Sequence, residues 1–500
     1  MSAGGPGPRP AGRVPAAGAG IPKAPAWVNV RLDGNQGRAP TPQFLAGLAR
    51  EVEAIRRYPL DDSLEQVLAH RHGVAVDRIF VGAGGDDVLD RLCRAVLEPG
   101  RRAIVPAPTF EMLERYVPLA GAELVSVPWT DGVWPRRAVL DAVTADTALV
   151  AIVSPNNPTG LVATVDDVRA VCAAAPNAAV LVDAAYAEFG GEDLTAAALS
   201  FPNTVVVRTF SKAFGLAGLR VGYAIARPDV VRWLRSVGSP FTCGTWSRRA
   251  AEVRLLEGGA EVAAYVRDVA RERDAMERHA AKRGLAPLPS AGNFVFVRPP
   301  EPAWLRDALL GVGIAVRAFP SGVRITMPAD DRTFARLLAA IDAAVAPAAI
   351  LLDLDGVLAD IEGRSAIANL DDVCALAAVR PLGVVTSCPR RLAESVLQRH
   401  GFAPFVKALV TDEDGPGKPD PAPVRLALER LGATSAWMLG DNPSDVAAAR
   451  AAGVIPLAVA PSGIGGEAHA DRLRVAGAAR LIGGIAALRG LLESAARLVP

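Results

Sequence analysis

This sequence has few cysteines, no long apolar run and no excess of one charge. Its 5 cysteines are scattered among 500 residues without a CxxC pair, which is typical of reduced thiols in a cytoplasmic protein and argues against a disulfide scaffold. The 54 Lys and Arg residues nearly balance the 53 Asp and Glu residues, and no basic stripe is present, so we expect no nucleic-acid partner. Charged residues such as Asp342 interrupt the alanine-rich stretches, so we expect no membrane-spanning helix.

The length and pattern of the chain predict two catalytic units behind a tail. Residues 1–25 are almost entirely Gly, Ala, Pro and Arg, a composition typical of a disordered segment. Over residues 26–346, β-branched runs alternate with helical stretches, which predicts an α/β fold with a mostly parallel sheet covered by helices. A second α/β pattern occupies residues 348–500. Because the linker Ala346-Pro347-Ala348 is too short for free tumbling, we expect the two units to lie close together.

Individual elements can be placed from the same pattern. Buried strands are predicted over Ala103–Val105, Leu149–Val153, Val180–Asp183 and Val205–Val207, and one long helical region over Thr245–Arg283. A small α+β lobe is predicted from roughly 26–50 and 285–346, with strands over Phe294–Val297, Ile314–Val316 and Arg324–Met327.

Lys212 lies in a turn rich in Ser and Gly and is the first candidate for catalysis. A lysine that bonds to an aldehyde cofactor must lose its proton, which burial or neighbouring cations favour. A pyridine ring in that cofactor needs a carboxylate at its nitrogen, and Asp183 at the end of a predicted strand supplies one. Tyr186 and Asn157 are candidates to donate hydrogen bonds to a ring hydroxyl.

A phosphate cradle is predicted near this lysine. Gly84, Gly85 and Asp86 lie between a predicted strand and the helix that follows it. Backbone N–H groups at the start of a helix bind anions. Ser211 and Arg220 flank Lys212 and can hold the same phosphate.

At these residues the chain resembles the histidinol-phosphate aminotransferase family of fold-type-I pyridoxal-phosphate enzymes. The resemblance covers about Val30 to Ile341 and implies pyridoxal phosphate as cofactor and a homodimer. By that likeness Phe110 stacks on the cofactor ring, and Tyr58 reaches the cofactor phosphate of the neighbouring subunit. Arg324 binds the substrate's carboxylate or phosphate, with Arg317 nearby. The matching segments follow the family's order: Arg57–Pro59, Gly82–Asp87, Pro108–Phe110, Asn157–Gly160, Asp183–Phe189, Arg208–Arg220, Ser290–Phe294, Gly313–Arg317 and Arg324.

The sequence departs from this family around the substrate mouth. Where the family usually reads Asn-Glu-Asn-Pro-Tyr-Gly, this chain reads Gly34-Asn35-Gln36-Gly37-Arg38-Ala39-Pro40. Ala39 falls where the family's tyrosine closes on the substrate phosphate. Arg38 is a candidate to supply that anion contact, and a related substrate stays an alternative.

A second set of polar residues follows the apolar strand before Asp353. Hydrolysis of a phosphate ester through an acyl-phosphate needs a carboxylate nucleophile and a second carboxyl to protonate the leaving oxygen. Asp353 and Asp355 have that spacing, on one face of a strand end. The negative charge of the phosphoryl group must then be balanced by a cation, a lysine and a hydroxyl donor. Candidates for these roles follow at Thr386, Lys418, Asp441 and Asp445.

This order resembles the haloacid-dehalogenase (HAD) phosphatase superfamily over about Ala349 to Leu492. The likeness implies Asp353 as nucleophile, Asp355 as general acid/base, and Thr386 and Lys418 as phosphate ligands. A carboxylate set of this kind suits Mg²⁺, with the candidate ligands Asp353, Asp355, Asp441 and Asp445. The gaps of about thirty residues on either side of Thr386 hold no separate cap domain, so we expect an open site or one covered by the aminotransferase half or by a partner subunit.

Together the two patterns predict a bifunctional enzyme. Its first site would transaminate a phosphorylated amino alcohol or ketone of the histidinol phosphate type, with glutamate and 2-oxoglutarate as the second pair. Its second site would hydrolyse the phosphate ester of the product. Two alternatives stay open: a lyase resembling threonine-phosphate decarboxylase, or an aminotransferase of a related secondary-metabolic substrate, in either case with a C-terminal unit that only binds phosphate ligands and regulates.

Overall fold

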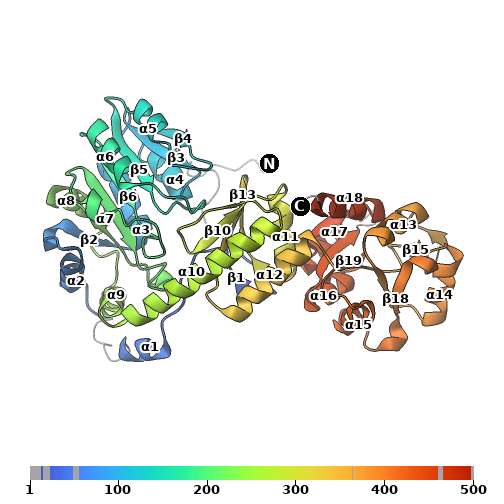
Figure 1. The fold of residues 1–500 in the computed structure, drawn as a ribbon. Helices are drawn as coiled ribbons and strands as arrows, with labels where there is room; N and C mark the ends of the chain where they lie inside the picture. The colour runs from blue at the N-terminus through green and yellow to red at the C-terminus, as the bar shows by residue number, and fades with distance from the viewer. Residues whose placement is uncertain (1–12, 15–22, 49–55, 363, 460–465, 497–500) are drawn as a thin grey trace, which may run out of the picture.

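The computed structural model describes residues 13–14, 23–48, 56–362, 364–459 and 466–496. Most of the predicted tail, and residues 49–50 of the predicted small lobe, therefore lie outside the described residues. Figure 1 shows three bodies in a row: a large sheet layered with helices, a middle lobe against α10 and α12, and a C-terminal sheet with its own helices. The fold is α/β throughout, as predicted.

The first body is built on a seven-stranded sheet in the order β2–β8–β7–β6–β5–β3–β4. β8 runs antiparallel to β2 and β7, and the other neighbours are parallel. All seven residues of β5 are buried, as expected for a parallel strand with helices on both faces. The strands are β2 (Ile79–Gly82), β3 (Arg102–Ala107), β4 (Glu123–Pro128), β5 (Thr147–Val153), β6 (Ala179–Asp183), β7 (Thr204–Thr209) and β8 (Gly222–Ile225). The four strands predicted here are confirmed.

Helices cover both faces of this sheet. α6 begins with a capping box in which Thr164 accepts from the Asp167 N–H and Asp167 accepts from the Thr164 N–H, an arrangement that stabilises a helix start. The helices are α1 (Pro42–Leu48), α2 (Ser63–His72), α3 (Gly84–Val96), α4 (Glu111–Leu119), α5 (Arg136–Ala142), α6 (Val165–Ala174), α7 (Thr195–Ala198) and α8 (Pro228–Ser236), with short 3₁₀ turns at Val76–Arg78 and Ala217–Leu219.

The long helical region predicted over Thr245–Arg283 is two helices, α9 (Thr245–Glu257) and α10 (Gly259–Lys282). The break falls at Gly258, where a Cβ atom would lie 2.7 Å from the carbonyl oxygen of Arg254. Two consecutive glycines also have low helix propensity, so the predicted helical region is confirmed but is divided into two helices at this point.

The middle lobe is an antiparallel sheet in the order β12–β13–β10–β9. A separate parallel pair joins β1 (Val30–Arg31) to β11 (Ile314–Ala315), which brings the N-terminal segment against this lobe. The predicted strand at Ile314–Val316 therefore pairs with β1 instead of the four-stranded sheet. The remaining elements are β9 (Pro287–Leu288), β10 (Phe294–Val297), β12 (Arg317–Phe319), β13 (Gly322–Thr326), α11 (Pro302–Gly311) and α12 (Asp331–Val345).

The C-terminal body has a six-stranded parallel sheet in the order β18–β17–β14–β19–β20–β21. Between β14 and β17 the described chain holds a two-stranded hairpin and one helix, so no cap domain is inserted there. The elements are β14 (Ala349–Leu352), β15 (Ala359–Asp360), β16 (Ser365–Ala366), α13 (Leu370–Val379), β17 (Leu382–Val385), α14 (Arg390–Arg399), β18 (Val406–Val410), α15 (Ala422–Leu431), β19 (Ala436–Gly440), α16 (Pro443–Ala451), β20 (Ile455–Val459), α17 (Gly466–Ala476), β21 (Arg480–Ile482) and α18 (Ile485–Ala496), with 3₁₀ turns at Ala403–Phe405 and Asp412–Asp414.

The C-terminal body packs against the middle lobe, as the short linker predicts. The rings of Trp304 and Trp437 meet at 5.0 Å in an edge-on arrangement. Trp437 donates its indole N–H to the carbonyl of Ala343 at 2.7 Å, and Arg480 pairs with Glu301 at 3.0 Å. Buried aromatic contacts of this kind favour one fixed arrangement of the two bodies.

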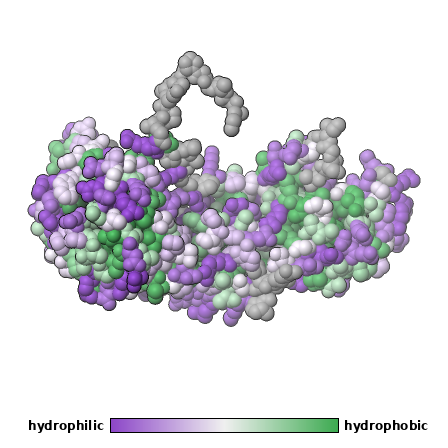
Figure 2. All heavy atoms as spheres, turned by 90° about the horizontal axis from the view of Figure 1, so that it is seen from above, coloured by the Kyte–Doolittle hydropathy of each residue, from purple (hydrophilic) through white to green (hydrophobic). Residues whose placement is uncertain are grey.

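None of the helices in the described parts of the chain is long and apolar enough to cross a membrane. Figure 2 shows hydrophilic residues spread over both ends of the visible face, with hydrophobic residues scattered between them.

Candidate functional sites

A cavity of about 600 Å³ lies beside the carboxyl ends of β5, β6 and β7, next to the middle lobe. It brings together residues that are far apart in the sequence. The predicted residues that line it are Gly85, Asp86, Phe110, Asn157, Asp183, Tyr186, Ser211, Lys212, Arg220, Arg317 and Arg324.

Asp183 ends β6 and is buried at the base of this cavity. Its Oδ1 accepts the Ala185 N–H at 3.1 Å. Burial raises the pKa of Asp183 to about 6, with the charge of Asp86 adding to the shift and that of Lys212 opposing it. A buried carboxylate with so few donors is stabilised by a cationic N–H partner, which is what a protonated pyridine nitrogen offers.

Lys212 follows β7, and its Nζ lies 5.5 Å from the centre of the Tyr186 ring and 3.5 Å from the Gly34 carbonyl oxygen. Tyr186 receives a hydrogen bond from Asn35 Nδ2 at 2.9 Å. Asn35 is itself buried and accepts from Thr326 Oγ1 at 2.8 Å. Sequence reasoning missed Asn35 as a site residue, because nothing in its local spacing shows that β13 would reach it.

The predicted phosphate cradle lies where two backbone segments approach closely. Gly84 and Gly85 begin α3, and a Cβ atom on Gly222 of β8 would lie 2.4 Å from the Gly84 carbonyl carbon and the Gly85 nitrogen. Arg220 reaches across to Asp86 at 2.7 Å. The helix start therefore presents its N–H groups beside a guanidinium, a combination suited to an anion.

Two arginines face the same cavity from paired strands. Arg317 and Arg324 are directly opposite in the β12–β13 register, and both guanidinium groups lie within 6 Å of the Phe319 ring centre, at 5.9 and 5.7 Å. Arg324 donates to Asn157 Oδ1 and, at 2.6 Å, to the Asp33 carbonyl, while its buried Nε has no partner. Burial lowers the pKa of Arg324. An unsatisfied buried N–H at a cationic centre fits an anionic ligand group.

Arg38 and Tyr58 lie outside this cavity. The sequence made Arg38 a candidate to contact a substrate anion. In the structure it instead pairs with Asp268 at 2.8 Å and donates to the Ala329 carbonyl. The fold of a single chain therefore does not support Arg38 as an anion contact. Tyr58 is 72% exposed and stacks on Phe241 with ring centres 4.9 Å apart.

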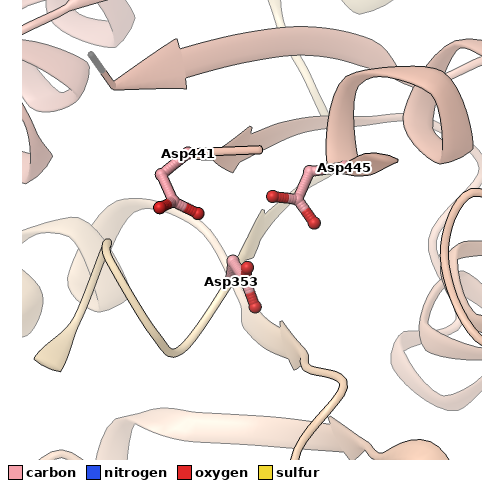
Figure 3. Close-up of side chains that lie close together, drawn as sticks. All are labelled: Asp353, Asp441 and Asp445. Atoms are coloured by element: carbon pink, nitrogen blue, oxygen red, sulfur yellow. The ribbon is translucent and has the colours of Figure 1, made fainter. Parts of the chain in front are cut away.

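A second polar cluster lies at the carboxyl ends of β14 and β19. Figure 3 shows Asp353, Asp441 and Asp445 turning their carboxylates toward a common space. One ligand oxygen from each lies within 4.8 Å of the others, as in sites that can hold a metal ion. Gly356 permits this approach, because a Cβ atom there would lie 2.2 Å from Asp441 Oδ2. Sequence reasoning did not single out this glycine.

Lys418 is the buried cation of the cluster, 2.9 Å from Asp353 and 2.5 Å from Asp445. Burial and the neighbouring charge of Asp445 raise the pKa of Asp353 to about 7, against the opposing effect of Lys418. Burial and Asp445 also raise the pKa of Asp441. Burial by itself disfavours the charged lysine, but its two carboxylate partners outweigh this and raise the pKa of Lys418.

The remaining predicted residues flank this cluster. Asp355 lies outside the three-carboxylate group, and its Oδ1 accepts the Ile361 N–H at 3.0 Å. Thr386 is buried at the end of β17, where its hydroxyl accepts the Cys388 N–H at 3.2 Å. His469, which the sequence did not indicate, donates from Nε2 to the Asp441 carbonyl at 2.6 Å.

Comparison with known proteins assigns the N-terminal and C-terminal parts of the chain to two families. Residues 25–341 match the family described as aminotransferase class I and II. The chain belongs to this family. Residues 370–453 of the aminotransferase also match the haloacid dehalogenase-like hydrolase family. Both resemblances drawn from the sequence are confirmed, and the protein is an enzyme with an aminotransferase part and a HAD hydrolase domain.

Individual relatives of this aminotransferase carry more than one name. A histidinol-phosphate aminotransferase from Staphylococcus saprophyticus is 35% identical over 58% of this chain and 83% of its own. An aromatic amino acid aminotransferase from Cutibacterium acnes is 32% identical over 60% of this chain and 88% of its own. The solved histidinol-phosphate aminotransferase from Sinorhizobium meliloti, in complex with pyridoxal-5'-phosphate, is 29% identical with a TM-score of 0.59, covering 63% of this chain and 91% of its own.

Proposed function

We propose that this chain is a bifunctional enzyme that transaminates a phosphorylated amino alcohol of the histidinol phosphate type and hydrolyses its phosphate ester. The observation that carries the proposal is the presence in one chain of two clusters of charged side chains with different chemistry. The first joins Lys212 to the arginine pair, and the second joins a carboxylate nucleophile candidate to a buried lysine.

The first cavity fits pyridoxal phosphate. The buried Asp183 carboxylate supplies the partner for a ring nitrogen, Phe110 an aromatic face, and Tyr186 and Asn157 polar groups for a ring oxygen. Gly84, Gly85, Ser211 and Arg220 would hold the phosphate. Bound pyridoxal phosphate supplies an electron sink for bond changes at the amino-bearing carbon.

The protein's own residues have distinct tasks in this reaction. Lys212 moves the proton at the amino-bearing carbon of the substrate, as a general base and then a general acid. Arg324, with its unpaired Nε, binds the anionic end of the substrate and fixes its orientation. Asn35 holds the Tyr186 ring in place beside Lys212. Orientation of this kind lowers the entropic part of the barrier.

The second site fits a phosphate ester and Mg²⁺. Three carboxylates and one lysine give a formal charge of −3 + 1 = −2, which a divalent cation would neutralise. Asp353, Asp441 and Asp445 are the candidate ligands from the geometry, and we assign proton transfer to the Asp355 carboxylate. The Asp353 oxygen attacks phosphorus as the ester oxygen departs with a proton from Asp355, and water then releases inorganic phosphate from Asp353.

We further propose that residues 26–346 and 348–500 are the two catalytic units, with 26–50 and 285–346 as the small lobe, and that the active form is a homodimer. Tyr58 supports the dimer, because it is exposed and outside its own chain's cavity.

Mixing Lys212→Ala chains with Tyr58→Phe chains should restore part of the transaminase activity, because one site in each mixed dimer then has both residues intact. No recovery on mixing would contradict a role for Tyr58 of the partner subunit.

The deciding experiment follows histidinol phosphate by ³¹P NMR with the full chain, pyridoxal phosphate, Mg²⁺ and 2-oxoglutarate. We expect signals of imidazole-acetol phosphate and of free phosphate. Asp353→Asn should abolish the free phosphate and keep transamination, and Lys212→Ala should do the reverse. An unchanged spectrum with the wild-type enzyme, alongside turnover of an aromatic amino acid and p-nitrophenyl phosphate, would refute this substrate.

A further inference from the structure

The mouth of the transaminase cavity holds an acidic residue beside the arginine pair. Glu111 is the first residue of α4, directly after Phe110, and lines the same cavity as Arg317 and Arg324. Its two carboxylate oxygens lie 3.1 and 3.4 Å from one nitrogen of Arg317. An acid in the first turn of a helix also interacts favourably with the helix dipole. From the sequence alone, Glu111 would therefore be expected only to stabilise the start of a helix.

The charges around the mouth of the transaminase cavity show what the Glu111 carboxylate can bind there. Arg317 and Arg324 are cross-strand partners, and two like charges in that position repel each other. Arg324 is buried, and its Nε is unpaired. The side chain of Glu111 is 44% exposed and that of Arg317 19%. With Glu111 ionised the three side chains sum to +2 − 1 = +1, so the mouth offers a cationic pocket at Arg324 and a carboxylate acceptor a short distance away.

We infer that Glu111 determines substrate specificity, by selecting substrates that carry an anionic group and, apart from the reacting amine, a cationic or N–H-donating group. The anionic group binds the arginines, and the donor binds Glu111. An imidazole ring is such a donor, so the inference rests on the proposed function and deepens it. A dicarboxylate such as 2-oxoglutarate offers no donor to Glu111, so the negative charge of Glu111 weakens its binding to the arginines without preventing it.

This role predicts opposite effects of one substitution on two ligands. In the holoenzyme, Glu111→Gln should lower kcat/KM for histidinol phosphate about 3- to 10-fold, because a charged partner is lost at a partly exposed position. The same substitution should tighten the binding of succinate, an unreactive dicarboxylate, by a similar factor in isothermal calorimetry. Glu114→Gln, on the same helix but outside the cavity lining, should leave both values within twofold of wild type.

The two measurements separate the possible failures. If both ligands weaken together in Glu111→Gln, the residue has a structural role and the inference is wrong; it is equally wrong if neither ligand changes. If the wild-type enzyme does not turn over histidinol phosphate, the proposed substrate fails, but the succinate measurement still tests Glu111. Unchanged succinate binding would then overturn the inference.

Discussion

At the scale of single residues, two buried ion pairs of the C-terminal unit share Lys418. Its ammonium group lies 2.9 Å from Asp353 and 2.5 Å from Asp445, and all three side chains are nearly inaccessible. Asp445 also accepts the Asn442 N–H at the start of α16. Lys418 is therefore linked through Asp445 to the start of α16.

Replacing Lys418 with Met should destabilise the C-terminal unit, because two buried carboxylates lose their cation. Loss of one partner of a buried pair typically costs about 3–5 kcal/mol. Adding Asp445→Asn should recover part of this loss, since Asn keeps the helix cap without the charge. Urea unfolding of the full chain without Mg²⁺ measures both. Equal stability of the single and double variants would contradict the charge argument.

A second residue-scale prediction concerns proton transfer at Asp355. Asp355→Asn should reduce Mg²⁺-dependent hydrolysis of p-nitrophenyl phosphate by about 10²–10⁴-fold, the usual contribution of general acid/base catalysis. Its transaminase activity should be unchanged, since Asp355 does not line the other cavity. Asp471→Asn, an exposed site on α17, serves as the control. Retention of hydrolysis in Asp355→Asn would remove this residue from the mechanism.

At the scale of elements, α2 is joined to β8 through His72. Its Nε2 lies 3.0 Å from the hydroxyl oxygen of Tyr223. Burial, together with the nearby charge of Arg208, lowers the pKa of His72 from 6.5 to about 4. The unfolded chain therefore takes up a proton near pH 6.5 that the folded chain accepts only near pH 4, so stability decreases as the pH falls through this window.

The contact between His72 and Tyr223 can be tested through the pH dependence of the free energy of unfolding. His72→Gln should lose less stability than wild type between pH 7 and pH 4, by about 1–2 kcal/mol after allowance for partial exposure. Urea midpoints across this range give the comparison. His70→Gln, exposed on the same helix, should follow the wild-type curve. Parallel curves for His72→Gln and wild type would show that this histidine does not limit acid stability.

At the scale of the whole molecule, the hydrolase domain and the small lobe share one buried contact layer. Trp437 belongs to β19 of the hydrolase domain, yet its indole N–H is bonded to Ala343 of α12. Trp304 of α11 donates to the neighbouring Ala344 carbonyl at 3.1 Å and meets the Trp437 ring edge-on. The lobe that carries Arg317 and Arg324 is thus anchored to the hydrolase domain.

Weakening the contact layer around Trp437 should lower the thermal stability of both units. Trp437→Phe removes the N–H donor and leaves a buried carbonyl unpaired, at a cost of about 1–3 kcal/mol. Differential scanning calorimetry should show lower midpoints for the aminotransferase and hydrolase transitions alike. Trp233→Phe, at a half-exposed position on α8, should shift neither. A shift confined to the hydrolase transition would mean that the two units unfold independently.

The sequence by itself determined the two chemistries and their order. Strands such as β5 and β7 could be placed because short apolar runs rich in β-branched residues are typical of strands buried on both faces. Lys212, Asp183 and Asp353 stand at or just after strand ends, and Lys418 lies in the loop before α15, so local spacing was enough to find them.

The tertiary structure decided which distant residues meet. Asn35 reaches Tyr186 because β1 pairs with β11, and Glu111 meets Arg317 because the small lobe faces α4. The turn of Arg38 toward Asp268 likewise depends on where α10 lies in the fold. Contacts between segments hundreds of residues apart depend on side-chain packing and charge in three dimensions, which local periodicity does not encode.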